Sequence, residues 1–243
     1  VHLRNPSLAD SWDDLLADPL HFCEVPVRPL QAAAAGLFQQ AALREAPRRA
    51  YLGNEFCESL IPSLESISKV CTQLWRKQVE ITLLTPPATD EGLDALRALF
   101  SWLSRQERKV EVVFNDWGTM ELLHGEFPGL QPVRGRLLNK TMRDPRVVPL
   151  YEARAAAAGI RARLQPSSLD TPFLRRLLEN YGVTRVELDI LVQDPDFDFR
   201  RLPFQVAFYL PYGFVTTGRH CMVSSLHMES SQRFRPSVRC RLE

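Results

Sequence analysis

The residues of this sequence that could take part in the most kinds of chemistry are its cysteines, because a thiolate can bind a metal ion or attack an electrophile. They are Cys23, Cys57, Cys71, Cys221 and Cys240, and no two of them have the spacing of a CxxC zinc motif. An odd number of cysteines, in a sequence without an apolar signal segment, favours a reducing compartment. We therefore expect a cytoplasmic protein whose thiols serve as metal ligands, nucleophiles or parts of the core.

Local context separates some of these roles. Cys71 lies on the apolar stripe of an expected helix, so we expect it to pack in the core as a small hydrophobe. His220 next to Cys221 suggests a Cys–His nucleophile, but adjacent residues of an extended segment point to opposite sides. The sequence has no HExxH, GxSxG or Gly-rich phosphate motif. Metalloprotease, serine hydrolase and nucleotide-binding chemistry therefore have no motif to support them.

The elements that must position these side chains alternate between apolar strands and helices. Expected helices begin at Pro62, at an Asp90 cap and at Thr171–Pro172, and a shorter helix surrounds Met120. The expected strands cover residues 48–53, 79–84, 109–116, 131–139, 183–192 and 204–213. This alternation is typical of parallel βαβ units.

We predict an α/β fold, an incomplete or distorted TIM-like (β/α) barrel with an N-terminal extension. The six or seven expected strands fall short of the eight that close such a barrel, and a doubly wound open sheet is the alternative. Residues 1–45 form the extension, which holds four prolines and leads into an Ala-rich helix at 31–46. Residues 46–225 form the barrel domain, and residues 226–243 form a C-terminal tail that carries Cys240.

In both architectures ligands bind at the carboxyl ends of the strands. Polar residues that follow the expected strands are therefore candidates for a site. They are Asn54, Glu55, Cys57, Thr85, Asn115, Asp116, Asn139, Lys140, Gln193, Asp194, Thr216, Thr217, Arg219, His220 and Cys221. Cys57 and Cys221 should accordingly lie on the same face although they are far apart in the sequence.

A basic segment, residues 134–146, follows one of these strands. It carries Arg134, Arg136, Lys140, Arg143 and Arg146. One interpretation is a solvated loop, and the other is an anion-binding rim for a carboxylate or phosphate substrate. In the second case Lys140 and Arg143, together with Asn115 and Asp116, are the substrate-binding candidates. We expect Lys140 and Arg143 to be exposed, so that their loss affects ligand binding more than stability.

The overall charge does not indicate a nucleic-acid or membrane partner, although a local basic patch and an RNA partner remain possible. Lys and Arg number 30 against 29 Asp and Glu, a net charge of +1, which gives no bulk attraction to nucleic acids or acidic membranes. No apolar run approaches the ~20 residues that a membrane-spanning helix requires. We expect no membrane span.

Three stretches of the chain, in their order and spacing, resemble the peptidase U32-like family. They are YLGNEFCES at 51–59, VVFNDWGTMELL at 112–123, and TRVELDILV followed by PYGFVTTGRHCMVSS at 211–225. Within that family they are most similar to the anaerobic ubiquinone-hydroxylation proteins, in which a YLG strand is followed by a cysteine. The resemblance implies a (β/α)-barrel-like fold with an oxygen-sensitive iron–sulfur cluster, [4Fe–4S], on cysteine thiolates.

Position by position, the resemblance implies three cluster ligands. Cys57 matches the cysteine after the first strand, Cys221 the cysteine after a Gly-Arg pair, and Cys240 the downstream group. The family has an earlier cysteine where this chain reads GFVTT at 213–217. The fourth ligand is therefore expected beyond Glu243, in a longer protein, or at Cys23.

The function that the resemblance implies is O2-independent hydroxylation of a ubiquinone-precursor type of substrate, in a hetero-oligomer with a related family member. The alternatives are a non-catalytic partner subunit and a factor for RNA-base hydroxylation. Peptidase activity, from which the family takes its name, has the least support, because the sequence shows no convincing nucleophile set.

Overall fold

The apolar strands expected from the sequence pair in parallel within one sheet. The computed structural model of this chain describes residues 2–3, 9–17, 48–144, 146, 167–190, 198–209, 213–218 and 228–233. Within these ranges seven parallel strands follow one another across the sheet in sequence order. They are β1 (His2–Leu3), β2 (Arg49–Gly53), β3 (Glu80–Leu84), β4 (Val110–Phe114), β5 (Gln131–Arg134), β6 (Arg185–Asp189) and β7 (Gln205–Tyr209).

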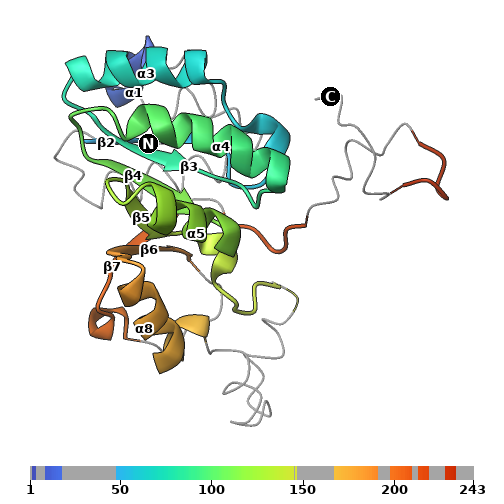
Figure 1. Cartoon of the computed structure of the whole chain (residues 1–243). Coiled ribbons are helices and arrows are strands. Elements are labelled where there is room, and N and C mark those ends of the chain that lie inside the picture. The colour runs from blue at the N-terminus through green and yellow to red at the C-terminus, as the bar shows by residue number, and fades with distance from the viewer. Residues whose placement is uncertain are drawn as a thin grey trace, which may run out of the picture.

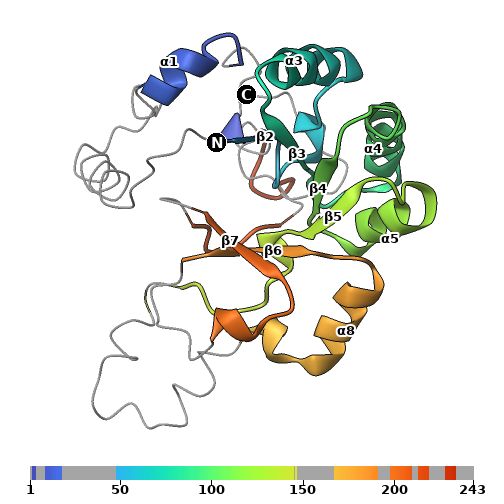
Figure 2. The same cartoon turned by 90° about the vertical axis from the view of Figure 1, so that its left-hand side faces the viewer.

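The strand order decides between the two predicted architectures. A doubly wound sheet reverses at a switch point, whereas here each strand pairs with the next one along the chain, so that alternative is wrong. The sheet also curls, because the rings of Tyr51 on β2 and Tyr209 on β7 have centroids 6.2 Å apart although β3 to β6 lie between their strands. Figure 2 shows this curl from the side. The α/β class and the curved all-parallel sheet fit an incomplete TIM-like barrel.

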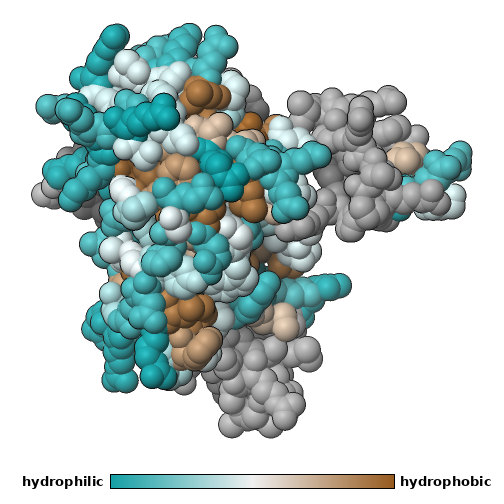
Figure 3. Space-filling view, in the orientation of Figure 1, coloured by the Kyte–Doolittle hydropathy of each residue, from teal (hydrophilic) through white to brown (hydrophobic). Residues whose placement is uncertain are grey.

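Helices cover the outer, convex side of the curved sheet (Figures 1 and 2). They are α1 (Trp12–Ala17), α3 (Leu64–Arg76), α4 (Asp90–Leu103), α5 (Trp117–Glu126) and α8 (Pro172–Asn180). Short 3-10 turns are η2 (Glu58–Leu60), η3 (Arg136–Leu138), η5 (Ser168–Asp170) and η6 (Phe199–Arg201). The helical face seen in Figure 3 is mostly hydrophilic, with small apolar groups between the charged side chains.

Capping side chains explain where the two longest helices begin. The Ser63 hydroxyl accepts an N–H of the first turn of α3 at 3.2 Å, so the helix begins after Ser63 and not at Pro62. The Thr89 hydroxyl accepts the Gly92 N–H at 3.4 Å. Thr89 is therefore the N-cap of α4, and Asp90, the predicted cap, is its first helical residue.

The main core lies between the sheet and the helices. Strand residues such as Val112 and Phe114 pack there against the apolar stripes of α3 and α4. Cys71 belongs to the α3 stripe and is fully buried, which confirms its prediction as a core residue. On the concave side of the sheet, a small apolar cluster of Leu84, Val113 and Val133 is surrounded by polar side chains.

The first residues of the chain take part in the same sheet and core. His2 pairs with Tyr51 in the β1–β2 ladder, and Trp12 is buried in the main core. This part of the predicted extension is thus integral to the barrel-like unit. The predicted Ala-rich helix at 31–46 and the tail segment with Cys240 lie outside the described residues. No helix within the described ranges is long and apolar enough to cross a membrane.

Candidate functional site

The loop after β2 places Cys57 at the C-terminal edge of the sheet, the edge at which the strands end. The side-chain oxygen of Asn54 accepts the backbone N–H groups of Phe56 and Cys57 at 2.8 and 2.9 Å. This turn fixes the backbone of the loop immediately before the thiol. Gly53, with φ +104°, makes the turn possible, because a Cβ there would lie 2.4 Å from the Leu84 carbonyl oxygen.

The side chain of Cys57 is more exposed than that of a core cysteine. It is half-buried and not in a disulfide. Within the part of the chain that the structure describes, it makes no hydrogen bond. Cys71, in contrast, is fully buried, and burial raises the pKa of its thiol to about 12. The two thiols therefore differ in burial, and the role of Cys57 as a cluster ligand stays a prediction.

An aromatic contact connects the Cys57 loop to the chain that leads toward Cys221. Phe56 and Phe214 meet edge to face, with ring centroids 5.7 Å apart. Phe214 follows β7 and precedes Cys221 by seven residues. Cys221 itself, Cys240 and Cys23 lie outside the described residues, so the convergence of the predicted cluster ligands stays a prediction.

Arg136 occupies the centre of the C-terminal edge, where η3 begins after β5. Its guanidinium donates to both carboxylate oxygens of Glu55, at 3.0 and 2.8 Å, and to Asp189 at 2.7 Å. It also lies over the ring of Tyr209, 3.9 Å from the centroid. Burial acts to lower the pKa of Arg136, but its hydrogen bonds to Glu55 and its attraction to Asp189 outweigh burial and raise it. The result is a charged cluster that joins the ends of β2, β5 and β6.

Arg143 completes this charged cluster. It donates to Asp189 at 3.0 Å and to the carbonyl oxygens of Asn139 and Arg136 at 2.8 and 3.2 Å. Its side chain is only 8% exposed, so the expectation of an exposed Arg143 is wrong, whereas Lys140 is exposed as expected. A run of basic residues in the sequence cannot reveal carboxylates that reach it from distant strands.

The interpretation of residues 134–146 as a solvated loop is also wrong for the start of the segment. Arg134 and Arg136 are buried. Arg134 donates to the Leu138 carbonyl and, at 3.0 Å, to Ser168, while its other two nitrogens have no hydrogen-bond partner among the residues that the structure describes. Burial, together with repulsion from Arg143, lowers the pKa of Arg134 to about 10.

Asn115 and Asp116 hold neighbouring loops together. The Asn115 amide donates to the Thr85 carbonyl at 2.8 Å and accepts the Leu137 N–H at 3.2 Å, which ties the loops after β3, β4 and β5. A Cβ on Gly135 would lie 2.1 Å from the Asn115 oxygen, so this approach requires glycine.

Asp116 caps α5. It accepts the N–H and hydroxyl of Thr119 at 2.9 and 2.7 Å, and the Ala88 N–H at 3.2 Å. Asn115 and Asp116 thus have a demonstrated positioning role, and their contact with a substrate stays a prediction.

A second polar layer lines the concave face below the charged cluster. Glu187 on β6 accepts a hydrogen bond from Tyr209 at 2.8 Å, and burial raises the pKa of Glu187 to about 7. Arg185 pairs with Glu111 at 2.5 Å and donates to the Tyr51 hydroxyl at 3.0 Å. Burial and the nearby Glu187 charge raise the pKa of Tyr51 to about 12.

Sequence reasoning missed Arg185, Glu187 and Asp189. A signal was nevertheless present, because the strand reads RVELD and alternates charged with apolar residues. In a strand, such alternation places the three charged side chains on one face.

Several large apolar side chains of the described residues are exposed. We call the following seven the apolar rim, since each lies in a loop that follows a strand or at the start of the next helix: Leu60, Leu64, Trp117, Met142, Phe173, Ile190 and Val215.

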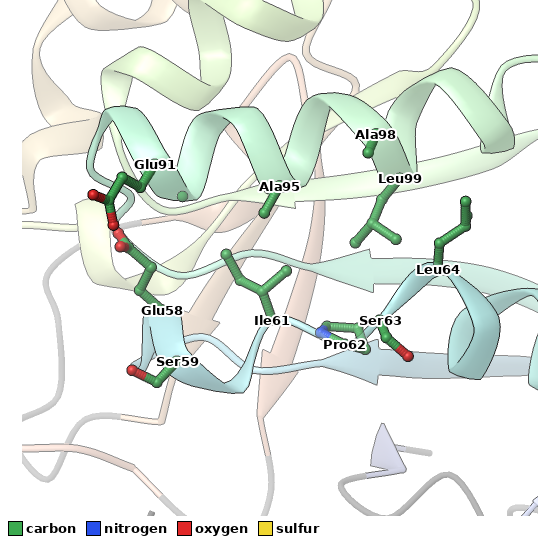
Figure 4. A pocket seen from close by; sticks show the side chains of 11 residues that line it. Glu58, Ser59, Ile61, Pro62, Ser63, Leu64, Glu91, Ala95, Ala98 and Leu99 are labelled. Atoms are coloured by element: carbon green, nitrogen blue, oxygen red, sulfur yellow. The ribbon is translucent and has the colours of Figure 1, made fainter. Parts of the chain in front are cut away.

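A hollow of about 410 Å³ adjoins the Cys57 loop (Figure 4). Ile61 projects toward Ala95 and Leu99 of α4, while Glu58 and Glu91 lie at one end. A second hollow, of about 430 Å³, lies at the opposite edge of the barrel, where Gln131 of β5 and His124 and Tyr181 of the neighbouring helices line it.

Cys57 has the chemistry that an iron–sulfur ligand needs, because such clusters are held by cysteine thiolates. Of the implied ligand set, it is the one that falls within the described ranges. Among those residues, no three His, Cys, Asp or Glu side chains are grouped as for a metal ion. No family model, curated protein or solved structure matches this chain.

Proposed function

We propose that this chain is an iron–sulfur protein of the U32-like type that acts in O2-independent hydroxylation. Cys57, Cys221 and Cys240 would hold a [4Fe–4S] cluster, with the fourth ligand at Cys23 or beyond Glu243. The observation that supports this best is the position of Cys57. Its free thiol lies at the C-terminal edge, where barrel enzymes bind ligands, and the segment leading to Cys221 packs against its loop through Phe214.

A bound cluster would supply electron-transfer chemistry at this edge. Residues of this chain hold the Cys57 loop in place at that edge. Asn54 fixes the backbone of the Cys57 loop, and Glu55 ties that loop to Arg136. Below them Glu187 can hold or release a proton near neutral pH, and its Oε2 atom accepts a hydrogen bond from Tyr209.

The apolar rim supports the remaining parts of the proposal. A ubiquinone-precursor type of substrate is largely apolar and would contact such a surface at the strand ends. A hetero-oligomer with a related family member would cover part of the same rim.

One observation favours a second candidate, a non-catalytic partner subunit. Arg136 and Arg143 are both paired with Glu55 or Asp189, so the centre of the C-terminal edge is a closed, neutral cluster. A surface of this kind is better suited to holding loops in place than to binding an anionic substrate.

Anaerobic purification tests the proposal. We expect about four iron atoms per chain and a broad sulfur-to-iron absorption band. The Cys221→Ala variant should lose the iron and also melt earlier, because a ligand bound only by the folded state stabilises that state. Iron-free wild-type protein after reconstitution with iron and sulfide would overturn the proposal. Full iron and substrate turnover would decide against the non-catalytic alternative.

A further inference from the structure

The residue that follows Cys57 reaches across to another element. The Glu58 carboxylate accepts the Thr89 backbone N–H at 2.5 Å and the Thr89 hydroxyl at 2.7 Å. Thr89 is the N-cap of α4, so the carboxylate closes the exposed start of that helix. The first N–H groups of a helix have no partner within the helix, and a negative charge there is favourable.

Gly92 makes room for this contact. A Cβ at that position would lie 2.6 Å from the nearer carboxylate oxygen of Glu58 and 2.9 Å from its Cγ. Any side chain at position 92 would therefore displace the carboxylate from the helix start. The φ of Gly92 is not in the left-handed region, so backbone conformation does not require glycine here.

Helix α4 is a firm anchor for the loop. It has 14 residues, and its Leu96, Leu99 and Phe100 side chains are buried in the main core. Asn54 fixes the loop on the other side of Cys57. The thiol is thus held between a turn at the end of β2 and a carboxylate fastened to α4.

We propose that Glu58 is a positioning residue for Cys57, holding the Cys57 loop against the start of α4 so that its thiol keeps a fixed place at the C-terminal edge. This inference rests on the proposed function of Cys57 as a cluster ligand. Loss of a group that orients a metal ligand typically lowers metal affinity about 10–100-fold.

Alkylation of the iron-free full-length chain tests the positioning role without any cluster. Mass spectrometry of the peptides gives separate rates for Cys57 and for buried Cys71, which reports global opening. We expect Glu58→Ala to raise the Cys57 rate roughly fivefold, since two charge-assisted hydrogen bonds are lost, and to leave the Cys71 rate unchanged. Glu58→Gln keeps an acceptor for the Thr89 N–H and should restore most of the protection.

Two further variants separate positioning from stability. Gly92→Ala should raise the Cys57 rate like Glu58→Ala, although alanine favours the helix over glycine and should not lower the melting temperature. Glu91→Ala is the matched control, because it removes an exposed charge from the same first turn of α4 and should leave the Cys57 rate unchanged. After reconstitution, Glu58→Ala and Gly92→Ala should lose iron to a chelator faster than Glu91→Ala.

The outcomes distinguish this inference from the function on which it rests. A Cys57 rate in Glu58→Ala within about twofold of wild type, or equal increases at Cys57 and Cys71, would overturn the positioning role alone. If Cys57→Ala keeps its full iron, the cluster assignment of Cys57 fails, whereas the alkylation rates still decide whether Glu58 holds the Cys57 loop.

Discussion

Removing Arg136 should destabilise the fold more than removing Arg143 or Lys140, which lie in the same basic segment. Arg136→Met keeps the length and apolar packing of the side chain but leaves Glu55 as a carboxylate that is 1% exposed, without the guanidinium that binds both its oxygens. Asp189 loses one partner and keeps Arg143. Breaking a buried pair by removing one partner costs about 3–5 kcal/mol.

Three matched variants give stability changes with which the loss in Arg136→Met can be compared. Arg143→Met should cost less, about 1–3 kcal/mol, because Asp189 then retains Arg136. Lys140→Met, on the exposed part of the same segment, should stay within about 0.5 kcal/mol. The double variant Arg136→Met/Glu55→Gln should be more stable than Arg136→Met alone, because it removes the unpaired charge.

Denaturant unfolding of the four variants and the wild type measures these differences. The reasoning predicts the order Arg136→Met, then the double variant and Arg143→Met, then Lys140→Met, from the least to the most stable. A loss below about 1 kcal/mol for Arg136→Met, or no recovery in the double variant, would refute the account of the charged cluster.

Three more predictions concern other parts of the site. Burial raises the pKa of Glu187 from 4.5 to about 7, so between these pH values the folded state binds more protons than the unfolded state. The free energy of unfolding should therefore fall as the pH rises from 4.5 to about 7. Denaturation at several pH values should show a flatter pH dependence of stability for Glu187→Gln than for the wild type. Gly135→Ala should lower the free energy of unfolding by about 1–3 kcal/mol, because its Cβ would clash with Asn115. Gly125→Ala, which has open space around its Cβ in α5, should be neutral or stabilising. Similar unfolding midpoints for the two variants would argue against the close packing of Gly135 on Asn115. Trp117→Ser should change stability by no more than about 0.5 kcal/mol, yet weaken the proposed hetero-oligomer when the chain is co-expressed with a U32-like protein and analysed by sedimentation. Unchanged sedimentation would remove Trp117 from the proposed contact surface.

Local patterns predicted the elements of this fold well. The apolar runs at 79–84 and 109–116 become β3 and β4, and the stripe that includes Cys71 becomes the buried face of α3. The starts of α3 and α4 differ from the prediction by one or two residues, because hydroxyl caps at Ser63 and Thr89 determine them.

The charged cluster could not be predicted in the same way. Arg136 meets Glu55 and Asp189 across 81 and 53 residues of sequence, a distance over which neither periodicity nor composition carries information. The sequence alone therefore left a solvated loop as one interpretation of residues 134–146. The alternating RVELD strand was a local sign that charges line the concave face.

Iron content of Cys57→Ala and Cys71→Ala, purified side by side without oxygen, tests the central claim most directly. Both changes remove one thiol, but Cys57 is half-buried at the C-terminal edge and Cys71 is fully buried in the core. The account predicts that Cys71→Ala keeps the iron of the wild type and that Cys57→Ala loses it. Equal iron in the two variants would contradict the assignment of Cys57 to a cluster.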